Sequence, residues 1–419
     1  MSYAARLCGL VGLLASIATV GCESLLAGAN PDLPMWVRHP SGAMNVILRR
    51  KVTVSERVAG EDYEHGRPEI DPVHRRVFMG SSDRGLYALR ADDGQSLWRF
   101  ETMGPVQSEP VYDGREDVVY FGSNDGALYK VAARDGQLLW RFMTNAEVSR
   151  RPVLQDGIVY VVNANDTVCA IEANSGKLRW TQHRTPAFGM EVAGYAGPLV
   201  TRDRVYVAFS DGHVAAYDPL DGAERWPLID LSAEVEQAQG DVPRYLDVDT
   251  TPVLDTLSVG RVVYVASYAG GVFSLDAKTG ARVWVNDRAT GVTQLALWEQ
   301  RPHPARDGTS PEVPGRKLLL GSSGTTGLWA LDTEDGREIW RRRLPDGGVS
   351  VPVPIAGALL VSTTRYGLFL FSPIDGGVID GLDLAGGLTM APAVHGRRAF
   401  VLSNTGVLLG LHVDPPGGT

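Results

Sequence analysis

The feature that most constrains this chain is a short recurring pattern: a turn residue, a glycine, three residues and a tryptophan. It occurs six times, at Gly94/Trp98, Gly136/Trp140, Gly176/Trp180, Gly222/Trp226, Gly280/Trp284 and Gly336/Trp340. Each unit carries too few apolar residues to bury a core alone, so neighbouring units must stack on each other. The pattern therefore predicts a repeat protein, in which function is expected on surfaces.

Each period has room for four short strands. Ahead of most units stand a proline-containing strand and a second strand, as in EPVYDGREDVVYFGS from Glu109, separated by turns rich in Gly, Asp and Asn. Successive tryptophans are 42, 40, 46, 58 and 56 residues apart. Four strands in about 40–45 residues is the size of one propeller blade. The predicted fold is all-β, an eight-bladed β-propeller.

The ends of the repeat predict how the ring closes. A degenerate unit starts at Thr364, and a last unit, SNTGVLLGLHV from Ser403, stops before its outermost strand. Residues 43–54 hold an unassigned β-prone segment, MNVILRRKVTV. We expect this amino-terminal strand to complete the last blade, which leaves no open blade edge at the junction. Seven blades is the alternative, if the weak unit around Gly376/Asp380 is not independent.

Residues that recur once per unit are expected to be structural. The six tryptophans, Trp98, Trp140, Trp180, Trp226, Trp284 and Trp340, are predicted to pack blade against blade and not to bind a ligand. Prolines recur in the first strand of six units, at Pro110, Pro152, Pro198, Pro252, Pro352 and Pro392. A proline removes a hydrogen-bond donor, so this strand is expected at the central channel. Two insertions interrupt the period: residues 228–245, acidic and partly helical, and residues 298–317, rich in proline.

The amino terminus predicts export and lipid anchoring. Residues 1–21 have a basic head, an apolar run from Leu7 to Val20 and small residues before Cys22, which is typical of a lipoprotein signal. We expect Cys22 to be lipidated, residues 22–42 to form a tether, residues 43–413 to form one propeller domain and residues 414–419 to form a tail. Thr19 departs from the usual leucine, so ordinary signal cleavage is the alternative. Glu23, the acidic residue directly after the anchor cysteine, leaves retention of the protein in the inner membrane as an alternative location.

Composition excludes several function classes. The net charge is −9 with no dense Lys/Arg cluster, which disfavours binding to nucleic acid or to anionic lipid. With three cysteines in the chain and Cys169 alone beyond the anchor, the domain has no internal disulfide, and Cys169 is expected to be a small buried apolar residue. The chain has no HExxH, Cys/His cluster, GxGxxG, P-loop or GxSxG motif, so no catalytic residue, metal or cofactor is predicted.

The unit GxLYALDAxxGxxxW resembles the repeat of pyrroloquinoline-quinone propellers over roughly residues 66–413. That resemblance implies the fold. The quinoprotein dehydrogenases of the superfamily carry adjacent cysteines, calcium-binding acidic residues and, in some members, a CxxCH haem site. This chain has neither adjacent cysteines nor CxxCH. A quinone-dependent periplasmic dehydrogenase is therefore the alternative, as is another interaction module of the same fold.

The segment RYLDVDTTPV, Arg244–Val253, resembles the RxxDVDTTPV segment of the BamB family. The resemblance implies a non-catalytic lipoprotein scaffold of the machinery that assembles β-barrels in the outer membrane, at its periplasmic face. It implies the periplasmic domains of the barrel-inserting subunit as the partner. Unfolded outer-membrane proteins, bound by strand addition at an exposed edge, are a further expected partner.

The resemblance also implies the contact residues. Arg244, Asp247 and Asp249 fall on one contact loop, and Met190 and Val192 fall on a second loop whose family arginine is Ala193 here. Independently, two alternating carboxylates on a loop are able to meet arginines of a partner, with apolar contact from Met190 and Val192. Two alternatives stay open: the aspartates cap a turn and bond the backbone around Thr250 and Thr251, or the pair holds calcium.

Overall fold

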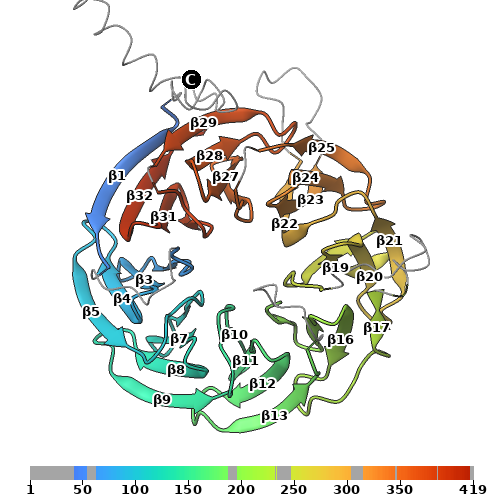
Figure 1. Ribbon diagram of the computed structural model, residues 1–419, viewed down its shortest axis with the longest axis horizontal. Helices are drawn as coiled ribbons and strands as arrows, with labels where there is room; N and C mark the ends of the chain where they lie inside the picture. Colours follow the sequence, from blue (N-terminus) through green and yellow to red (C-terminus); the bar gives the residue numbers. More distant parts are fainter. Residues whose placement is uncertain are drawn as a thin grey trace, which may run out of the picture.

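The computed structural model describes residues 42–53, 63–186, 196–231, 233, 247–302, 315–344, 347–384 and 386–415. Eight four-stranded antiparallel sheets stand around a central channel as the blades of a propeller (Figure 1). The predicted eight-bladed, all-β fold is confirmed, and the seven-bladed alternative is wrong. Within these residues, none of the helices has the length and apolarity that a membrane crossing requires.

The first four blades follow the chain from the channel outward. Blade 1 has β2 (Glu69–Asp71), β3 (Arg76–Gly80), β4 (Gly85–Arg90) and β5 (Ser96–Glu101). Blade 2 has β6 (Val111–Asp113), β7 (Val118–Gly122), β8 (Ala127–Ala132) and β9 (Leu138–Met143). Blade 3 has β10 (Val153–Gln155), β11 (Ile158–Val162), β12 (Thr167–Glu172) and β13 (Leu178–His183). Blade 4 has β14 (Leu199–Val200), β15 (Val205–Ala208), β16 (His213–Tyr217) and β17 (Ile229–Asp230).

The remaining blades keep this order except at the end of the chain. Blade 5 has β18 (Val253–Leu257), β19 (Gly260–Ser267), β20 (Gly271–Asp276) and β21 (Arg282–Asn286). Blade 6 has β22 (Val292–Gln300), β23 (Arg316–Ser323), β24 (Gly327–Asp332) and β25 (Glu338–Arg342). Blade 7 has β26 (Val353–Ile355), β27 (Ala358–Thr363), β28 (Gly367–Phe371) and β29 (Val378–Asp383). Blade 8 has β30 (Ala393–His395), β31 (Arg398–Leu402), β32 (Val407–Val413) and β1 (Met44–Lys51).

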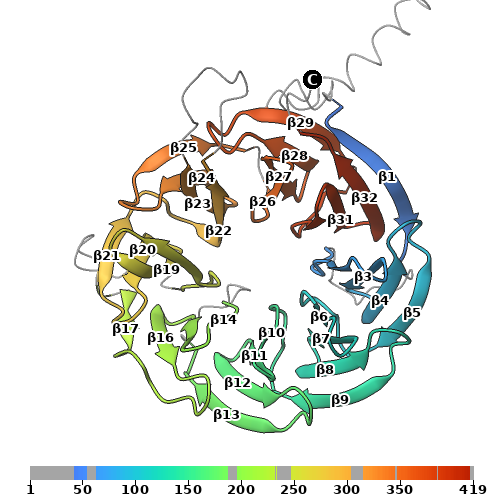
Figure 2. The same ribbon diagram turned by 180° about the vertical axis from the view of Figure 1, so that it is seen from behind.

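The closing strand is the one that the sequence predicts. β1 pairs antiparallel with β32, from Met44 opposite Val413 to Lys51 opposite Val407. The amide of Asp414 also donates to the carbonyl of Ala43 at 2.9 Å. The first and last strands of the described chain therefore lie in one blade (Figure 2), and the ring is closed by their backbone hydrogen bonds.

Burial explains the strand sequences. The second and third strands of each blade are sandwiched between neighbouring blades, and VVYFG of β7 is buried at all five positions. Each recurring proline directly precedes the innermost strand, as Pro110 does β6, so the prolines stand just before the first strands and not in them. Figure 2 shows β6, β10, β14 and β26 toward the channel, as the prolines predict.

One insertion is shorter than the sequence predicts. Trp298, expected at the start of the proline-rich insertion, belongs to β22, pairs with Leu318 of β23 and is 7% exposed. The two strands continue to Gln300 and from Arg316, because the pairing extends along the insertion at both ends. Residues 303–314, and most of the acidic insertion after β17, lie outside the described residues.

The antiparallel order gives the disc two distinct faces. The crossover face carries the turns between the second and third strands, together with the segments that lead from the outermost strand of one blade to the innermost strand of the next. The terminal face carries the other two sets of turns and the chain ends next to Met44 and Val413. Residues 42 and 43, where this part of the described chain begins, therefore lie on the terminal face.

Six of the eight contacts between neighbouring blades, here called seams, are built alike. The indole Nε1 of Trp98 donates to the carbonyl of Ala133 in the next blade at 3.0 Å, and its ring lies against Gly136, whose φ is +74°. A Cβ on Gly136 would come within 2.7 Å of that ring, so the glycine is needed there. The other five seams repeat this contact, with Trp140, Trp180, Trp226, Trp284 and Trp340 donating to Ala173, Pro219, Ala277, Thr333 and Pro373.

Blade 8 has two seams without tryptophan. In blade 7 the tryptophan position is Asp380, fully buried, whose carboxylate accepts hydrogen bonds from the amides of Met44 at 2.8 Å and Gly381 at 2.9 Å. In blade 8 the position is Leu48, which lies against Gly94 of blade 1. Asp380 thus fixes the first residue of the closing strand.

Candidate partner-binding site

The described part of the family-like segment is a crossover from blade 4 to blade 5. The amide of Val248 donates to Phe209 of blade 4, and the carbonyl of Asp247 accepts from Tyr268 of blade 5. The hydroxyl of Thr250 bonds both backbone groups of Ala266, and that of Thr251 accepts from the amide of Gly197 at 2.9 Å. The segment therefore holds blades 4 and 5 together through hydrogen bonds to both.

Much of this segment is shared by the repeat. Ser108 bonds both backbone groups of Gly122 in blade 2, as Thr250 does with Ala266 in blade 5. The amide of Val106 likewise donates to Ser81 of the preceding blade. The pattern Val-x-Ser/Thr-x-Pro is thus a structural feature that blades 2 and 5 share. The two aspartates are what distinguish blade 5.

Asp247 and Asp249 are buried acids. Their exposed fractions are 3% and 8%, and within the described chain both carboxylate oxygens of Asp247 and Oδ1 of Asp249 have no hydrogen-bond partner. Burial, and then the neighbouring Asp247, raise the pKa of Asp249 to about 8, although Arg150 acts in the opposite direction. Ionising both buried acids is costly, so near neutral pH the pair holds a proton on Asp249, and a positive partner group would favour its ionised form.

A third acid lies near this pair. Asp166 of blade 3 contributes to the raised pKa of Asp249, and burial raises the pKa of Asp166 itself despite hydrogen bonds from Ser210. Its Oδ1 has no hydrogen-bond partner either. Blades 3 to 5 therefore bring three buried acids near one another on the crossover face.

The structure corrects two expectations for Asp247 and Asp249. They are not carboxylates displayed on an exposed loop, because the crossover segment is drawn between blades by its backbone hydrogen bonds. Nor do the orphaned oxygens cap the turn at Thr250 and Thr251, whose hydroxyls bond other blade residues. The other predicted positions, Met190, Val192, Ala193, Arg244 and the anchor Cys22, lie outside the described residues.

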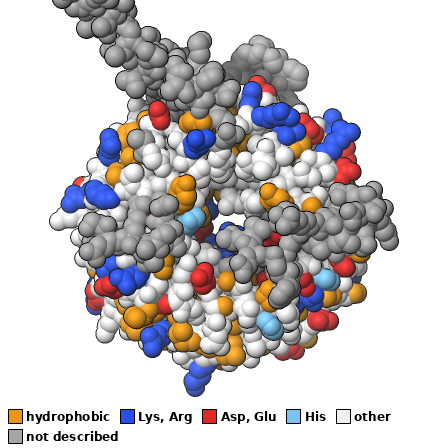
Figure 3. Space-filling model, viewed as in Figure 1, with side chains coloured by type: hydrophobic (Ala, Val, Ile, Leu, Met, Phe, Trp, Pro, Cys, Tyr) orange, Lys and Arg blue, Asp and Glu red, His pale blue; other side chains and the backbone are white. Residues whose placement is uncertain are grey.

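Sequence reasoning missed a charged group at the channel. Arg151 of blade 3 binds the carboxylates of Glu69 in blade 1, at 3.1 Å, and Glu109 in blade 2. Arg67 also donates to Glu109 at 3.3 Å. Figure 3 shows the opening at the centre of the disc with charged side chains inside it. Each of the four residues lies directly next to the proline at the start of its blade, and that placement was the signal that the sequence offered.

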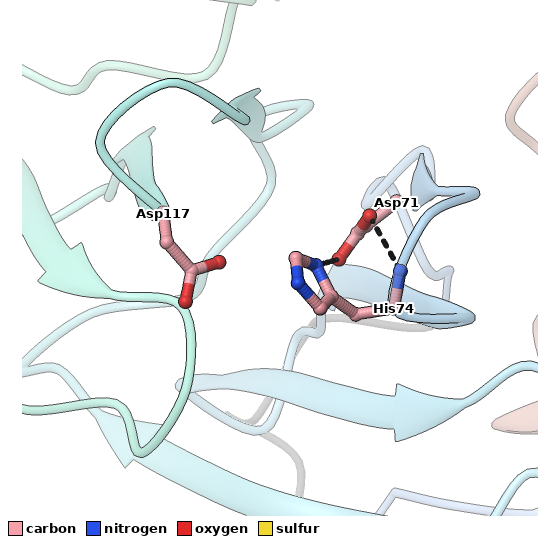
Figure 4. A group of neighbouring side chains, drawn as sticks. All are labelled: Asp71, His74 and Asp117. Carbon is pink, nitrogen blue, oxygen red and sulfur yellow. Dashed lines mark hydrogen bonds and ion pairs between the residues drawn. The ribbon is translucent and has the colours of Figure 1, made fainter.

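A second charged group has donors that suit a metal. Asp71, His74 and Asp117 offer ligand atoms within 4.8 Å of one another (Figure 4). Arg76, however, donates to Asp71 at 2.8 Å and also to Asp117, so a guanidinium already supplies the positive charge. Burial would raise the pKa of Asp71, but hydrogen bonds from His74 and Arg76 outweigh it and lower that pKa. We assign the group to the seam of blades 1 and 2.

The fold and the repeated seams define the class of this protein: an eight-bladed propeller built from quinoprotein-type repeats. The sequence profile described as "Outer membrane protein assembly factor BamB" matches residues 82–297 and 293–414. The chain belongs to this family.

Individual relatives agree with the profile. BamB of Escherichia coli K12 is 30% identical over 312 residues, which cover 68% of this chain and 66% of that protein. BamB of Legionella pneumophila is 26% identical over 55% of this chain, which spans about half, 54%, of that relative's length. The crystal structure of BamB from Moraxella catarrhalis superposes with a TM-score of 0.64 at 20% identity, covering 86% of this chain and 99% of that one, and shows the shared fold.

Proposed function

We propose that this protein is a non-catalytic scaffold that helps to assemble outer-membrane β-barrel proteins, held by a lipid on Cys22 at the periplasmic face of the outer membrane. It binds the periplasmic domains of the barrel-inserting subunit through the crossover face of blades 4 and 5. The observation that carries this proposal is the buried, unsatisfied acid pair Asp247 and Asp249, on the segment that resembles the family's contact loop.

The chemistry of the pair supports a cationic partner group. A guanidinium that enters between the two carboxylates would supply the hydrogen bonds that they lack and offset their repulsion. Such a charge-assisted contact, removed on one side only, commonly costs 2–5 kcal/mol, which is a loss of affinity of about 30-fold or more. Asp247 and Asp249, held between blades 4 and 5, would therefore recognise a cationic group of the partner specifically.

The test is co-purification of the barrel-inserting subunit with tagged protein. Asp247→Asn/Asp249→Asn keeps the side-chain shapes and removes the charges, so the complex is expected to be lost while the ring stays folded. The control is Asp287→Asn/Asp383→Asn, which removes two exposed acids on the same face and is expected to keep the complex. Intact co-purification of the first variant, folded as judged by its melting temperature, contradicts the assigned contact.

A second part of the proposal is that the protein binds unfolded outer-membrane proteins, here called clients. β5, β9 and β13 end their sheets, so their outer edges have no strand partner among the described residues. β9 also exposes Leu138, Leu139 and Met143. A client strand is able to add to such an edge. Photo-crosslinkers at Leu139 and Met143 are expected to capture unfolded barrel proteins, and their failure to do so removes this contribution.

The competing class is a quinone-dependent dehydrogenase of the same fold. Pyrroloquinoline quinone and calcium added to purified protein are expected to leave no bound chromophore after gel filtration. A retained chromophore overturns the non-catalytic role. Membrane fractionation decides the location, with the protein expected in the outer-membrane fraction and not in the inner-membrane fraction that Glu23 keeps open.

A further inference from the structure

The closing strand β1 carries a run of basic residues on the outer edge of the ring. Arg49, Arg50 and Lys51 follow one another and are all exposed. Within the described chain no carboxylate lies within ion-pair distance of any of them, and Arg50 and Lys51 donate to the backbone carbonyls of Asp93 and Thr405. Three consecutive cations without an ion-pair partner contrast with the net charge of −9 of the whole chain.

The same strand exposes aliphatic side chains. Val46 and Ile47 have exposed fractions of 44% and 46%, on the outermost strand of blade 8. Figure 3 shows Lys and Arg side chains beside hydrophobic ones along the edge where β1 runs in Figure 1. Adjacent aliphatic and basic side chains are the combination that binds the interface of an anionic membrane.

We propose that the β1 edge, residues 46–51, contacts an anionic phospholipid surface and holds the disc edge-on to the membrane. The inference rests on the proposed function in one respect, because a lipid on Cys22 would place the bilayer at the strand that directly follows the tether. Edge-on contact leaves both flat faces of the disc open, including the crossover face with Asp247 and Asp249. Composition alone disfavours lipid binding, but it averages over the acidic remainder of the chain.

Addition of a client β-strand explains the properties of the β1 edge less well than contact with a membrane does. Ile47 stands at a β-bulge, where the register of β1 shifts between Val46 and Leu48. A bulge and a run of charged side chains are the devices that keep other strands off an exposed edge. The β9 edge has the opposite character, with three exposed apolar residues and one arginine, Arg141. The two edges therefore suit different partners.

The test is vesicle co-sedimentation of the unlipidated chain, carrying Cys22→Ser, with phosphatidylethanolamine/phosphatidylglycerol vesicles at low salt. Binding is expected to these vesicles, to weaken with salt, and to be absent with phosphatidylcholine. Each cation near an anionic surface strengthens binding about five-fold, so Arg49→Gln/Arg50→Gln/Lys51→Gln is expected to weaken it about 100-fold. Val46→Ser/Ile47→Ser is expected to reduce the salt-resistant part of the binding.

The matched control is Lys177→Gln/Arg179→Gln/Arg282→Gln, which removes three exposed cations from blades 3 and 5, across the ring. It is expected to bind like the parent chain. Equal losses in the two triple variants, or equal binding to neutral vesicles, overturn the proposal. So does capture of an unfolded barrel segment at β1 without vesicle binding. No assembly partner is present in this experiment, so a negative result leaves the partner contact at blades 4 and 5 standing.

Discussion

The seams that follow blades 1 to 6 and the two seams of blade 8 differ in the residues that pack between neighbouring blades. Each of the six tryptophan seams buries a large ring against a glycine and uses one indole donor. The closing blade instead has a carboxylate, Asp380, on one side and a smaller aliphatic residue, Leu48, on the other. The six regular seams share one tryptophan contact, whereas the closing blade combines apolar contacts with backbone hydrogen bonds between distant parts of the chain.

The largest effect is expected at a regular seam. Trp180 is 8% exposed and contacts Gly222 across the seam of blades 3 and 4. Trp180→Ala is expected to lower the free energy of unfolding by about 3–5 kcal/mol, because it leaves a cavity between blades. Urea denaturation followed by tryptophan fluorescence and circular dichroism measures this loss. A loss under about 1 kcal/mol would mean that the tryptophans do not carry the seams.

A smaller loss is expected at the closing seam. Leu48 is 9% exposed and packs against Val77, Met79 and Leu89 of blade 1. Leu48→Ala is expected to cost about 2–4 kcal/mol, since fewer buried atoms are removed than at a tryptophan. Comparison with Trp180→Ala under the same denaturation conditions shows which seam is stronger. If Leu48→Ala costs more, the closure and not the regular seam dominates stability.

The next effect isolates the hydrogen bonds of the closure. Asp380→Ala leaves the amides of Met44 and Gly381 without their acceptor, which is expected to cost about 1–3 kcal/mol. Hydrogen exchange of a peptide spanning residues 44–51 is expected to speed up, while exchange in blade 3 stays slow. Unchanged protection of β1 would show that its pairing with β32 suffices without Asp380.

The smallest effect concerns a regular seam that also carries buried charge, that of blades 4 and 5. The folded-state pKa of Asp249, about 8, lies above the usual aspartate value of 3.8, so the folded protein holds the proton more tightly. Stability is then fully present below about pH 4 and falls as pH rises toward 8. Asp249→Asn is expected to flatten the profile of melting temperature against pH between pH 5.5 and 8.0, because it removes the group whose pKa differs between the folded and unfolded states. If the parent protein and the Asp249→Asn variant give parallel profiles of melting temperature against pH, the pKa of Asp249 does not control this pH dependence.

The sequence predicts local periodicity well and placement in space poorly. The aligned repeat units, six of them with Gly-x3-Trp spacing, were enough for eight blades and for the closing role of residues 43–54, because the pattern records strands and contacts that most blades repeat. The burial of Asp247 was not predictable in the same way. Aspartates suggest exposure, and only the backbone bonds of Val248 and Thr250 to two blades show that the segment lies inside a seam.

The channel group illustrates the same limit. Arg151 lies 82 residues from Glu69 and 42 from Glu109, and no local pattern joins them. Their contact follows from the ring, which brings equivalent positions of blades 1, 2 and 3 to one point. The cationic run of β1 was readable in the sequence as RRK, but its exposure on the outer edge of the last blade required the pairing with β32.

Ring closure by the first strand also sets an order of events for the newly made chain. Asn45 contacts Asp414 across a separation of 369 residues, so β1 leaves the ribosome long before its partner strand exists. Until β32 arrives, an eight-residue segment with apolar and basic side chains stays without its native partner. Completion of the last blade is therefore expected to be the slow, late step of maturation, and the stage at which a periplasmic chaperone has the most to protect.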